Sequence, residues 1–529
     1  MQGVGFRPTV HRLASELGLG GSVQNDADGA TIEIEGSAEA VRAFGARLSA
    51  ELPPLARLDG TEEIELAPRG ERAFAVEDSV VGPRRRALVP PDAKLCDACR
   101  AELDDPSDRR HAYPFTTCTH CGPRFTLVTA LPYDRERTSM ARFPLCARCA
   151  TEYADPRDRR FHAEPTCCAD CGPRIALEGP DGELHASREH ALGLARAALA
   201  SGCIVAVQGL GGFQLACLAD DSAVLRRLRA EKRRPHRPFA VMVRDLATAR
   251  ELVVLRHEDE RLLASPRAPI LLAPRRESSA IAAEVAPESE DVGVLLPTTP
   301  LHVELFRAAP YRALVMTSGN LHDEPICRTV LEARTKLRGL ADFLLIHERE
   351  IVRRCDDSVV RTMPSGHALV RRSRGYVPEP IALPLAASEP VLALGGHLQN
   401  AVALAVDGEA FPSQHVGDLD TEPARAFQTE VASGLEAFLA VEPRVFAVDL
   451  HPDYASTWLG ERLAALRGGR VLRVQHHLAH AAATLGEHGA WPGEHERVGA
   501  LVLVGTGFGA PSELAGDDLH PDAWGAEWL

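Results

Sequence analysis

Two cysteine motifs, Cys96-Asp97-Ala98-Cys99 and Cys118-Thr119-His120-Cys121, decide how this chain is organised, because each has a second copy 50 positions later. The second copy reads Cys146-Ala147-Arg148-Cys149 and Cys168-Ala169-Asp170-Cys171, and a Gly-Pro-Arg sequence follows each copy. The surrounding region holds nine of the 13 cysteines and shows little apolar periodicity. We therefore predict one duplicated domain over residues 84–178, flanked by different domains on either side.

Each copy follows the pattern Cys-x2-Cys-x18-Cys-x2-Cys. A Cys-x2-Cys turn places two sulfur atoms on one side of a tight knuckle, and two knuckles close a tetrahedral thiolate site that suits zinc. Four protein ligands leave no open position, so we expect two structural zinc ions; the alternative is a set of unligated thiols. The predicted ligands are Cys96, Cys99, Cys118, Cys121, Cys146, Cys149, Cys168 and Cys171.

The composition excludes several classes of protein. The chain has 529 residues, of which 45% are hydrophobic and 25% charged, as is typical of a globular protein with domains of about 150 residues. Its net charge of −15 argues against general binding to nucleic acid. No run approaches the ~18 apolar residues of a membrane span, and the first residues do not read as a signal peptide. We therefore expect a cytoplasmic protein that uses its cysteines as metal ligands rather than in disulfides.

The flanking regions alternate between helix and strand patterns. Residues 1–82 combine helical spacings with a period-two strand at 31–35, which is most of a ferredoxin-like βαββαβ unit. Its first strand is missing, because the chain begins at the loop that should follow it, and we expect a misplaced start codon or a damaged domain. Residues 186–380 and 388–529 read as α/β regions separated by a proline-rich linker. The predicted fold class is multidomain, with α+β and α/β parts.

A glycine-rich loop opens the first region. Gln2-Gly3-Val4-Gly5-Phe6-Arg7 precedes a helix, and its backbone N–H groups, the helix N-terminus and the Arg7 guanidinium all favour a phosphoryl group. Asn25 ends the next strand, where its amide can orient a water molecule. The loop and this asparagine resemble the acylphosphatase signature, in which the arginine binds the phosphoryl group and the asparagine positions the attacking water. The resemblance implies that Arg7 and Asn25 are catalytic; the alternative is a surface turn before a capped helix.

Basic and hydroxyl residues mark the third region. Lys232, Arg234 and Arg237 lie where a basic helix ends before a strand; such groups can clamp a triphosphate, although basic runs are also typical of a solvated face. A later strand ends in Thr317-Ser318-Gly319-Asn320, and α/β sheets bind ligands at the carboxyl ends of their strands. Together these motifs resemble the YrdC-like family, which makes carbamoyl-type adenylates from ATP, except that Arg237 stands where that family usually has lysine. The resemblance implies nucleotide binding by Lys232, Arg234, Arg237, Thr317, Ser318 and Asn320.

Two histidines distinguish the fourth region. His476 and His480 are spaced i and i+4 on one helical face, where two imidazoles can share a metal, although such pairs are often structural. Glycine-rich turns precede and follow them, in an order that resembles the carbamoyltransferase domain of the actin-like ATPase group, where two histidines hold a metal near ATP. Two departures count against this additional metal: Val504 stands where the family usually has aspartate, and the chain stops at Leu529, about halfway through that domain.

The four regions in this order resemble one family over nearly the whole chain, the HypF-type carbamoyltransferases of hydrogenase maturation. The resemblance implies an acylphosphatase-like domain at 1–82, a double zinc-finger domain at 84–178, a YrdC-like domain at 186–380 and the N-terminal part of an actin-like carbamoyltransferase domain at 388–529. It also implies a relay: carbamoyl phosphate is hydrolysed, the carbamate reacts with ATP and Mg²⁺ to give carbamoyl adenylate, and the carbamoyl group passes to the C-terminal cysteine of a HypE-type partner for cyanide ligand synthesis.

Three further expectations concern what this chain does with that relay. The departures in the fourth region lead us to expect that it keeps the adenylation half and has lost or weakened the transfer half. One alternative is a threonylcarbamoyl-adenylate synthase of tRNA modification, against which the zinc repeat and the Gln2–Arg7 loop count. The other is a non-catalytic zinc-binding fragment, which would not bind ATP.

Overall fold

Two units make up the computed structural model of the chain. The first unit covers residues 1–322 and 326–377, and the second covers 323–325 and 378–529. The described residues are 3–25, 29–58, 60–77, 89–364, 366–491, 501–502 and 527–528. The phosphate loop, the cysteine repeat and the basic motif of the third region therefore fall in one unit, and the two histidines of the fourth region fall in the other.

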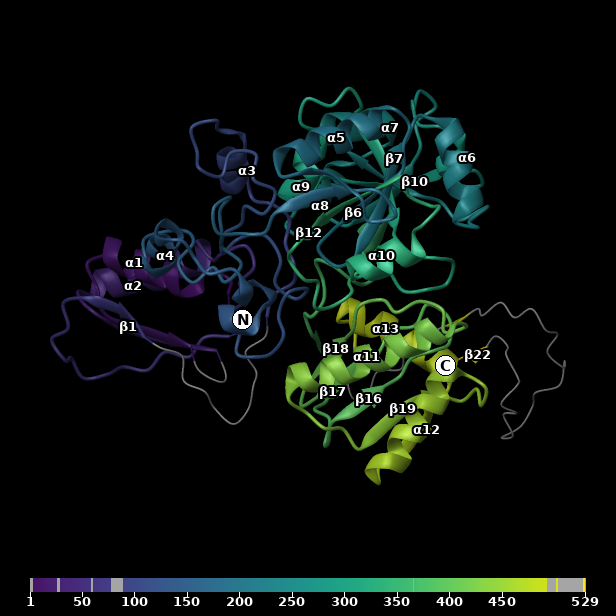
Figure 1. Cartoon of the computed structure of the whole chain (residues 1–529). Helices are drawn as coiled ribbons and strands as arrows, with labels where there is room; N and C mark the ends of the chain where they lie inside the picture. Colours follow the sequence, from purple (N-terminus) through teal and green to yellow (C-terminus); the bar gives the residue numbers. More distant parts are fainter. Residues whose placement is uncertain are drawn as a thin grey trace. The chain divides into compact units, whose positions relative to one another are not determined.

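The N-terminal part of the first unit is a small sheet covered by two helices (Figure 1). Its elements are α1 (Phe6–Glu16), β1 (Gly20–Asn25), β2 (Ala30–Glu35), α2 (Ala38–Ala50) and β3 (Phe74–Val76). Across the described residues the strand order is β2-β1-β3, with β1 antiparallel to β2 and parallel to β3. Helix α1 buries Val10 and Leu13 in one core with Phe44 and Leu48 of α2, because apolar side chains recur at helical spacing. The predicted α+β character of this region is confirmed.

The cysteine-rich part is built from two copies of a short helix followed by a loop. Its elements are α3 (Asp97–Asp104), the 3₁₀ turns η1 (Arg135–Arg137) and η2 (Ser139–Arg142), and α4 (Ala147–Ala154). Cys96 is the N-cap residue of α3 and Cys146 that of α4, so each helix starts at the first cysteine of its copy. Ala112 and His162, which are also 50 positions apart, both have a left-handed backbone, with φ of 53° and 49°. The predicted duplication is therefore present in the backbone.

The rest of the first unit is a large mixed sheet surrounded by helices (Figure 1). Its strands are β4 (Ile175–Glu178), β5 (Leu184–Ser187), β6 (Val205–Gln208), β7 (Phe213–Leu218), β8 (Ala240–Val243), β9 (Ile270–Pro274), β10 (Asp291–Leu295), β11 (Ala313–Ser318), β12 (Phe343–His347), β13 (Val359–Met363) and β14 (Gly366–Arg371). Its helices are α5 (Glu189–Ala200), α6 (Ser222–Glu231), α7 (Leu246–Leu252), α8 (His257–Ala264), α9 (Pro300–Phe306) and α10 (Val330–Lys336), with the 3₁₀ turn η3 (Ala283–Val285).

The strand order of this sheet explains where its ligand site lies. Within the described residues the order is β14-β13-β9-β10-β8-β11-β7-β6-β12-β4-β5. Strand β6 is buried at every position, as expected for a central strand covered on both faces. Helix α6 packs against β7 and comes directly before β8 in the chain, and β11 pairs with both β7 and β8. The basic motif after α6 and the Thr317–Asn320 segment at the end of β11 therefore come together.

The second unit is a separate α/β domain. Its elements are β15 (Ile381–Ala382), β16 (Val391–Ala393), β17 (Ala403–Val406), β18 (Glu409–Pro412), α11 (Glu422–Leu439), β19 (Val445–Asp449), α12 (Ala455–Arg467), β20 (Arg470–Val474), α13 (His476–His488), β21 (Leu501–Val502) and β22 (Glu527–Trp528). The main sheet has the order β15-β18-β17-β16-β19-β20 in the described part, with β16, β19 and β20 parallel. No helix in the described ranges of the chain is long and apolar enough to cross a membrane.

Candidate active sites and metal centres

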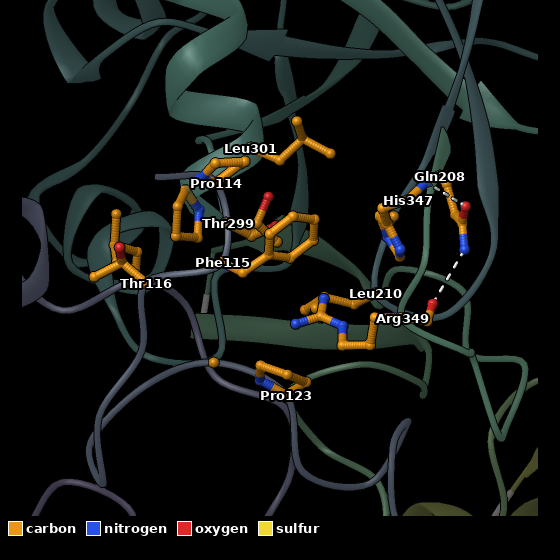
Figure 2. A pocket seen from close by; sticks show the side chains of 15 residues that line it. Pro114, Phe115, Thr116, Pro123, Gln208, Leu210, Thr299, Leu301, His347 and Arg349 are labelled. Carbon is orange, nitrogen blue, oxygen red and sulfur yellow. Dashed lines mark hydrogen bonds between the residues drawn. The ribbon is translucent and has the colours of Figure 1, made fainter. Parts of the chain in front are cut away.

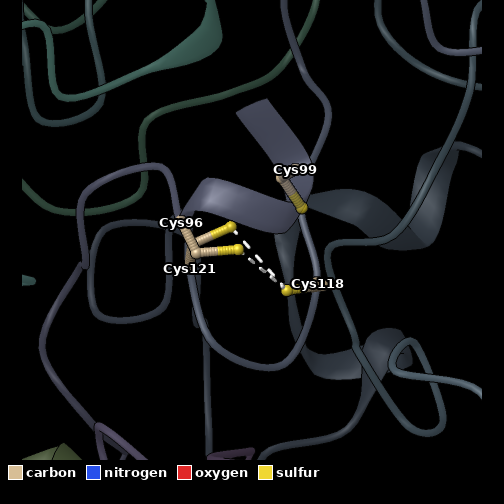
Figure 3. Close-up of side chains that lie close together, drawn as sticks. All are labelled: Cys96, Cys99, Cys118 and Cys121. Carbon is tan, nitrogen blue, oxygen red and sulfur yellow. Dashed lines mark hydrogen bonds between the residues drawn. The ribbon is translucent and has the colours of Figure 1, made fainter. Parts of the chain in front are cut away.

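The eight predicted cysteine ligands form two clusters of four. In each cluster the four Sγ atoms lie within 4.8 Å of one another. Cys118 Sγ lies 3.6 Å from that of Cys96 and 3.9 Å from that of Cys121 (Figure 3), and the Sγ atoms of Cys168 and Cys171 are 3.8 Å apart. A tetrahedron of sulfurs at about 2.3 Å from zinc has S···S distances of about 3.8 Å. Both clusters therefore fit a structural zinc ion, as predicted.

Each cluster receives a hydrogen bond from an arginine of the other copy. Arg159 Nη1 donates to Cys99 Sγ at 3.0 Å, and Arg109 Nη2 donates to Cys149 Sγ at 3.3 Å. Four thiolates around Zn²⁺ carry a net charge of −2, and a guanidinium donor stabilises that charge and orients the ligand. The sequence analysis did not identify these arginines. Their common offset of 50 positions was a signal that could have pointed to them.

Two glutamates also form ion pairs with arginines of the opposite copy. Arg110 donates to Glu152 across the boundary with an N···O distance of 2.5 Å, and Arg160 pairs with Glu102 in the equivalent way. Both arginines are nearly fully buried, so the carboxylates are needed to neutralise them. Partial burial would raise the pKa of Glu152, but the arginines outweigh it and lower the pKa to about 2. The two copies thus hold each other through buried ion pairs.

Arg7 and Asn25 line one pocket of about 470 Å³. Gly3 and Gly5 have φ of 72° and 79°, a left-handed backbone that favours glycine. Gly5 is the N-cap of α1, and the first turn of α1 carries no acidic residue, so the positive end of the helix dipole is available to an anion. Asn25 is 8% exposed at the end of β1. The structure therefore brings both predicted catalytic residues to one anion-binding pocket.

The cysteine-rich domain forms the other wall of this pocket. A Cβ atom on Gly3 would lie 2.4 Å from the ring of Tyr133, so the loop and this domain are in direct contact. Arg124 Nε also donates to the Gly3 carbonyl at 3.3 Å. The residues that this domain contributes are Thr119, Tyr133, Asp134, Phe161, His162 and Glu164. None of them was predicted from the sequence, because they are remote from the loop along the chain.

Lys232 is held at the carboxyl end of β11. Its Nζ donates to the Ser318 carbonyl at 2.7 Å and to Asn320 Oδ1 at 2.6 Å, and Ser318 Oγ donates to the same Oδ1 at 2.8 Å. Lys232 is 4% exposed, and this burial together with the neighbouring Arg234 lowers the pKa of the ammonium to about 7. Three of the predicted nucleotide-binding residues therefore form one hydrogen-bonded group.

Further positive charges gather beside Lys232. Burial and the nearby guanidiniums of Arg371 and Arg237 lower the pKa of Arg234 to about 10. Arg237 is exposed, and Thr317 is buried in β11 directly before Ser318. Arg371 lies at the end of β14, at the start of the basic sequence Arg371-Arg372-Ser373-Arg374, which is a candidate for closing over phosphates. Such a gathering of cations around a strand end suits the phosphates of a nucleotide.

His476 and His480 lie together at the start of α13. Their Nε2 atoms are 3.1 Å apart, and His476 Nδ1 is 2.6 Å from Asp449 Oδ2. In the part of the chain that the structure describes, however, only the two cysteine clusters bring three or more metal-ligating side chains together. An additional metal at the histidine pair is therefore not supported, and Val504 lies outside the described residues.

A further pocket, of about 410 Å³, lies between the cysteine-rich domain and the large sheet (Figure 2). The Arg349 guanidinium is 5.1 Å from the centre of the Phe115 ring, and Gln208 Nε2 donates to the Arg349 carbonyl at 3.2 Å. Burial and the neighbouring Arg349 lower the pKa of His347 to about 3, so this imidazole is neutral at pH 7. We assign these residues a role in joining the two domains.

A glycine-rich loop at a helix N-terminus and a cationic cluster at a strand end, joined by a duplicated cysteine-rich domain, fit a multidomain transferase that handles phosphorylated substrates. Matches to family models agree with this class. An acylphosphatase model matches residues 1–76, a HypF finger model matches 95–128 and 145–178, a model described as telomere recombination, for the Sua5, YciO and YrdC group, matches 197–373, and a HypF Kae1-like domain model matches 386–487.

Full-length relatives identify the family. The carbamoyltransferase HypF of Synechocystis sp. is 43% identical over 529 residues, which are all of this chain and 67% of that protein. The one of Rhodobacter capsulatus is 43% identical over 98% of this chain and 69% of its own length. The chain belongs to the HypF carbamoyltransferase family, and it spans about two thirds of the length of these relatives.

Solved structures of the family share the fold. A full-length HypF in a phosphate- and nucleotide-bound form has a TM-score of 0.90 and 37% identity, covering all of this chain and 67% of that one. The HypF of T. kodakarensis has a TM-score of 0.87 and 38% identity, with 66% of its chain covered. The predicted set of acylphosphatase, zinc-finger, YrdC-like and carbamoyltransferase domains is confirmed.

Proposed function

We propose that this chain hydrolyses carbamoyl phosphate at the Arg7 pocket and uses the carbamate with ATP to form carbamoyl adenylate at the Lys232 cluster. The observation that carries the proposal is that both sites lie in one unit: the cysteine-rich domain forms one wall of the Arg7 pocket, and the same domain borders the large sheet that carries Lys232 and Ser318. Carbamate decomposes in water, so keeping its production and use within one unit is an advantage. The phosphate- and nucleotide-bound state named for a relative is consistent with two such sites.

The first step needs a held phosphoryl group and a placed water molecule. Arg7 and the backbone N–H groups at the start of α1 bind the phosphoryl oxygens of carbamoyl phosphate. Asn25 orients a water molecule toward phosphorus. The new P–O bond to water forms as the bond from phosphorus to the carbamoyl oxygen breaks, which releases phosphate and carbamate.

The second step needs neutralised phosphates. Lys232, Arg234 and Arg237 bind the phosphates of ATP, which binds as its Mg²⁺ complex, and Thr317, Ser318 and Asn320 hold the nucleotide at the end of β11. A carbamate oxygen attacks the α-phosphorus, and pyrophosphate leaves. Because the pKa of Lys232 is about 7, its protonated form, which is the form that attracts phosphate, is favoured below pH 7.

We assign the last step to the second unit. There the carbamoyl carbon forms a bond to the C-terminal cysteine sulfur of a HypE-type protein, AMP leaves, and the product serves cyanide ligand synthesis for [NiFe] hydrogenase. The match of residues 386–487 to a HypF domain supports this assignment. Mass spectrometry of a HypE C-terminal peptide incubated with the chain, carbamoyl phosphate and ATP tests it: a carbamoylated cysteine supports the assignment and overturns the weakened transfer expected from the sequence, and an unmodified peptide contradicts the assignment and supports that expectation.

Exchange of labelled pyrophosphate into ATP tests the first two steps. We expect exchange that depends on carbamoyl phosphate, with loss of exchange in Arg7→Ala and Lys232→Ala. Arg12→Ala, on the far side of α1, and Lys336→Ala, in the last turn of α10, are matched controls that keep it. No exchange by a zinc-loaded wild type would refute the proposal. A product that forms only when threonine is added would favour a threonylcarbamoyl-adenylate synthase instead.

A further inference from the structure

Glu164 is a buried carboxylate in the wall of the pocket that contains Arg7 and Asn25. The side chain is 3% exposed, and its Oε2 accepts a hydrogen bond from the Tyr153 hydroxyl at 2.8 Å. No donor to Oε1 is found among the described residues, and Oε1 is not one of the fully buried oxygen atoms without a partner, so it faces the pocket. A ligand that fills the pocket would bury this oxygen and must then supply a donor to it.

The internal duplication shows that this carboxylate is not needed to build the domain. With the offset of 50 positions, Glu164 corresponds to Pro114 and Tyr153 corresponds to Leu103. The hydrogen-bonded pair therefore exists only in the second copy, whereas the cysteines and the glutamate–arginine ion pairs exist in both. The second copy is also the one that supplies Phe161, His162 and Glu164 to the phosphate-loop pocket.

The chemistry of the pocket determines which end of a substrate Glu164 faces. The phosphoryl end is attracted to Arg7 and the N-terminus of α1, and a carboxylate beside it would repel it. Glu164 therefore faces the other end. In carbamoyl phosphate that end carries an amino group with two N–H donors, whereas in acetyl phosphate it carries a methyl group with none.

We propose that Glu164 Oε1 accepts a hydrogen bond from the amino group of carbamoyl phosphate and is a specificity-determining residue of the pocket. This inference rests on the proposed function of the loop. A site built to pair with an N–H group rejects the analogue that lacks it, because the buried acceptor is then left without a donor. The pKa of Glu164 is raised to about 7 by burial, with Asp134 contributing in the same direction, so the ionised, acceptor-only form of this carboxyl predominates above pH 7.

The test compares kcat/KM for carbamoyl phosphate and acetyl phosphate. We expect wild type to prefer carbamoyl phosphate and Glu164→Leu to reduce the preference roughly 10- to 100-fold, through carbamoyl phosphate alone. Glu164→Gln keeps an acceptor oxygen but loses the charge and should reduce the preference less, by roughly 3- to 10-fold. Glu136→Leu is the matched control, because Glu136 is exposed in η1 of the same domain and outside the pocket.

The possible outcomes separate this inference from the function on which it rests. A wild type that hydrolyses neither compound refutes the function proposed for the loop. A wild type without preference, or a Glu164→Leu variant that slows both reactions equally, overturns the role of Glu164. If Glu164→Leu loses zinc or unfolds, Glu164→Gln decides, and an unchanged ratio of the two kcat/KM values in that variant overturns the inference.

Discussion

The two cysteine copies have different neighbours: the first packs against α9 beside the large sheet and adds Thr119 to the pocket of the phosphate loop, whereas the second supplies Phe161, His162 and Glu164 to that pocket. In the first copy, Leu95 N–H donates to the Thr298 carbonyl at 3.0 Å, and Leu95 and Leu103 share a core cluster with Val303 of α9. In the second copy, Tyr153 and Glu164 instead form a polar pair at the pocket. The residues through which the copies contact each other are the same in both copies, whereas the residues that face other parts of the chain differ. The duplication therefore kept the metal-binding geometry, while the two copies pack against different parts of the chain.

The two clusters also differ in burial. In the first, only Cys96 is partly exposed, whereas in the second both Cys146 and Cys171 are. A thiolate with more access to solvent is more open to chelators and oxidants. We therefore expect the second zinc to be the more easily lost of the two.

The largest effect should come from removing a ligand, with Cys121→Ser compared with Cys171→Ser. Zinc measured by elemental analysis should fall from about two to about one per chain, and losing a structural zinc removes binding free energy on the order of 10 kcal/mol. Cys121→Ser should weaken both ATP binding and carbamoyl phosphate hydrolysis, because its copy adjoins the sheet and Thr119 of the same knuckle lines the phosphate-loop pocket. Cys171→Ser should mainly weaken carbamoyl phosphate hydrolysis. Equal losses of both activities in both variants would show that the two copies do not support different sites.

A smaller and symmetric effect is expected from Glu102→Gln and Glu152→Gln. Each change leaves a buried guanidinium without its carboxylate, which costs about 2–3 kcal/mol of the free energy of unfolding. The pKa of Glu152 lies near 2, below its ordinary value of 4.5, so its ion pair contributes fully at pH 7 and is lost only as the pH falls through about 2. Denaturant unfolding at pH 7 measures both variants, and clearly unequal values would show that the exchange is not symmetric.

A crossed effect is expected from Arg109→Ala and Arg159→Ala. Removing a donor to a metal-bound thiolate typically lowers metal affinity about 10- to 100-fold. Arg109→Ala should speed zinc release from the second cluster, and Arg159→Ala from the first. The rate of zinc release to a chromophoric chelator is measured in chains that also carry Cys121→Ser or Cys171→Ser. Because each of these changes leaves a single intact cluster, the rate can be assigned to that cluster. Arg157→Ala, whose side chain is 84% exposed, should change neither rate, and release from the same copy as the mutation would contradict the exchange.

The smallest effect should come from Asp104→Ala, which leaves the ion pair of Arg307 with the buried Glu304 in place. Arg307 Nη2 donates to Asp104 Oδ1 at 2.7 Å and joins the first copy to α9, but both side chains are partly exposed. Such pairs contribute about 0.2–1 kcal/mol. The second copy has Ala154 at the equivalent position and no such contact. Thermal unfolding should show a small decrease, and a loss as large as that of Glu102→Gln would show that the outer contacts matter as much as the inner ones.

Residues that are close together along the chain could be assigned to sites from the sequence, whereas the residues that surround those sites in space could not. The eight ligands follow from spacing alone, because each knuckle is a turn of four residues. Lys232 could be grouped with Ser318 and Asn320 only through a resemblance, and the structure brings them into contact; their binding of nucleotide stays a prediction. Contacts across domains, such as that of Glu164 with the phosphate-loop pocket, depend on how distant segments fold together. The offset of 50 positions marks Arg109 and Arg159 as equivalent, but it does not say which thiolates they contact.

The contacts between the two copies have the symmetry of a two-fold dimer. Arg109 of the first copy binds Cys149 of the second, and the equivalent Arg159 of the second copy binds Cys99 of the first; the two arginine–glutamate pairs follow the same rule. A single copy alone would leave a thiolate without its donor and two buried ions unpaired. Two separate, identical copies would satisfy both by associating, at a rate and extent set by their concentration. Joining them in tandem makes that association intramolecular, so it no longer depends on how much protein the cell contains.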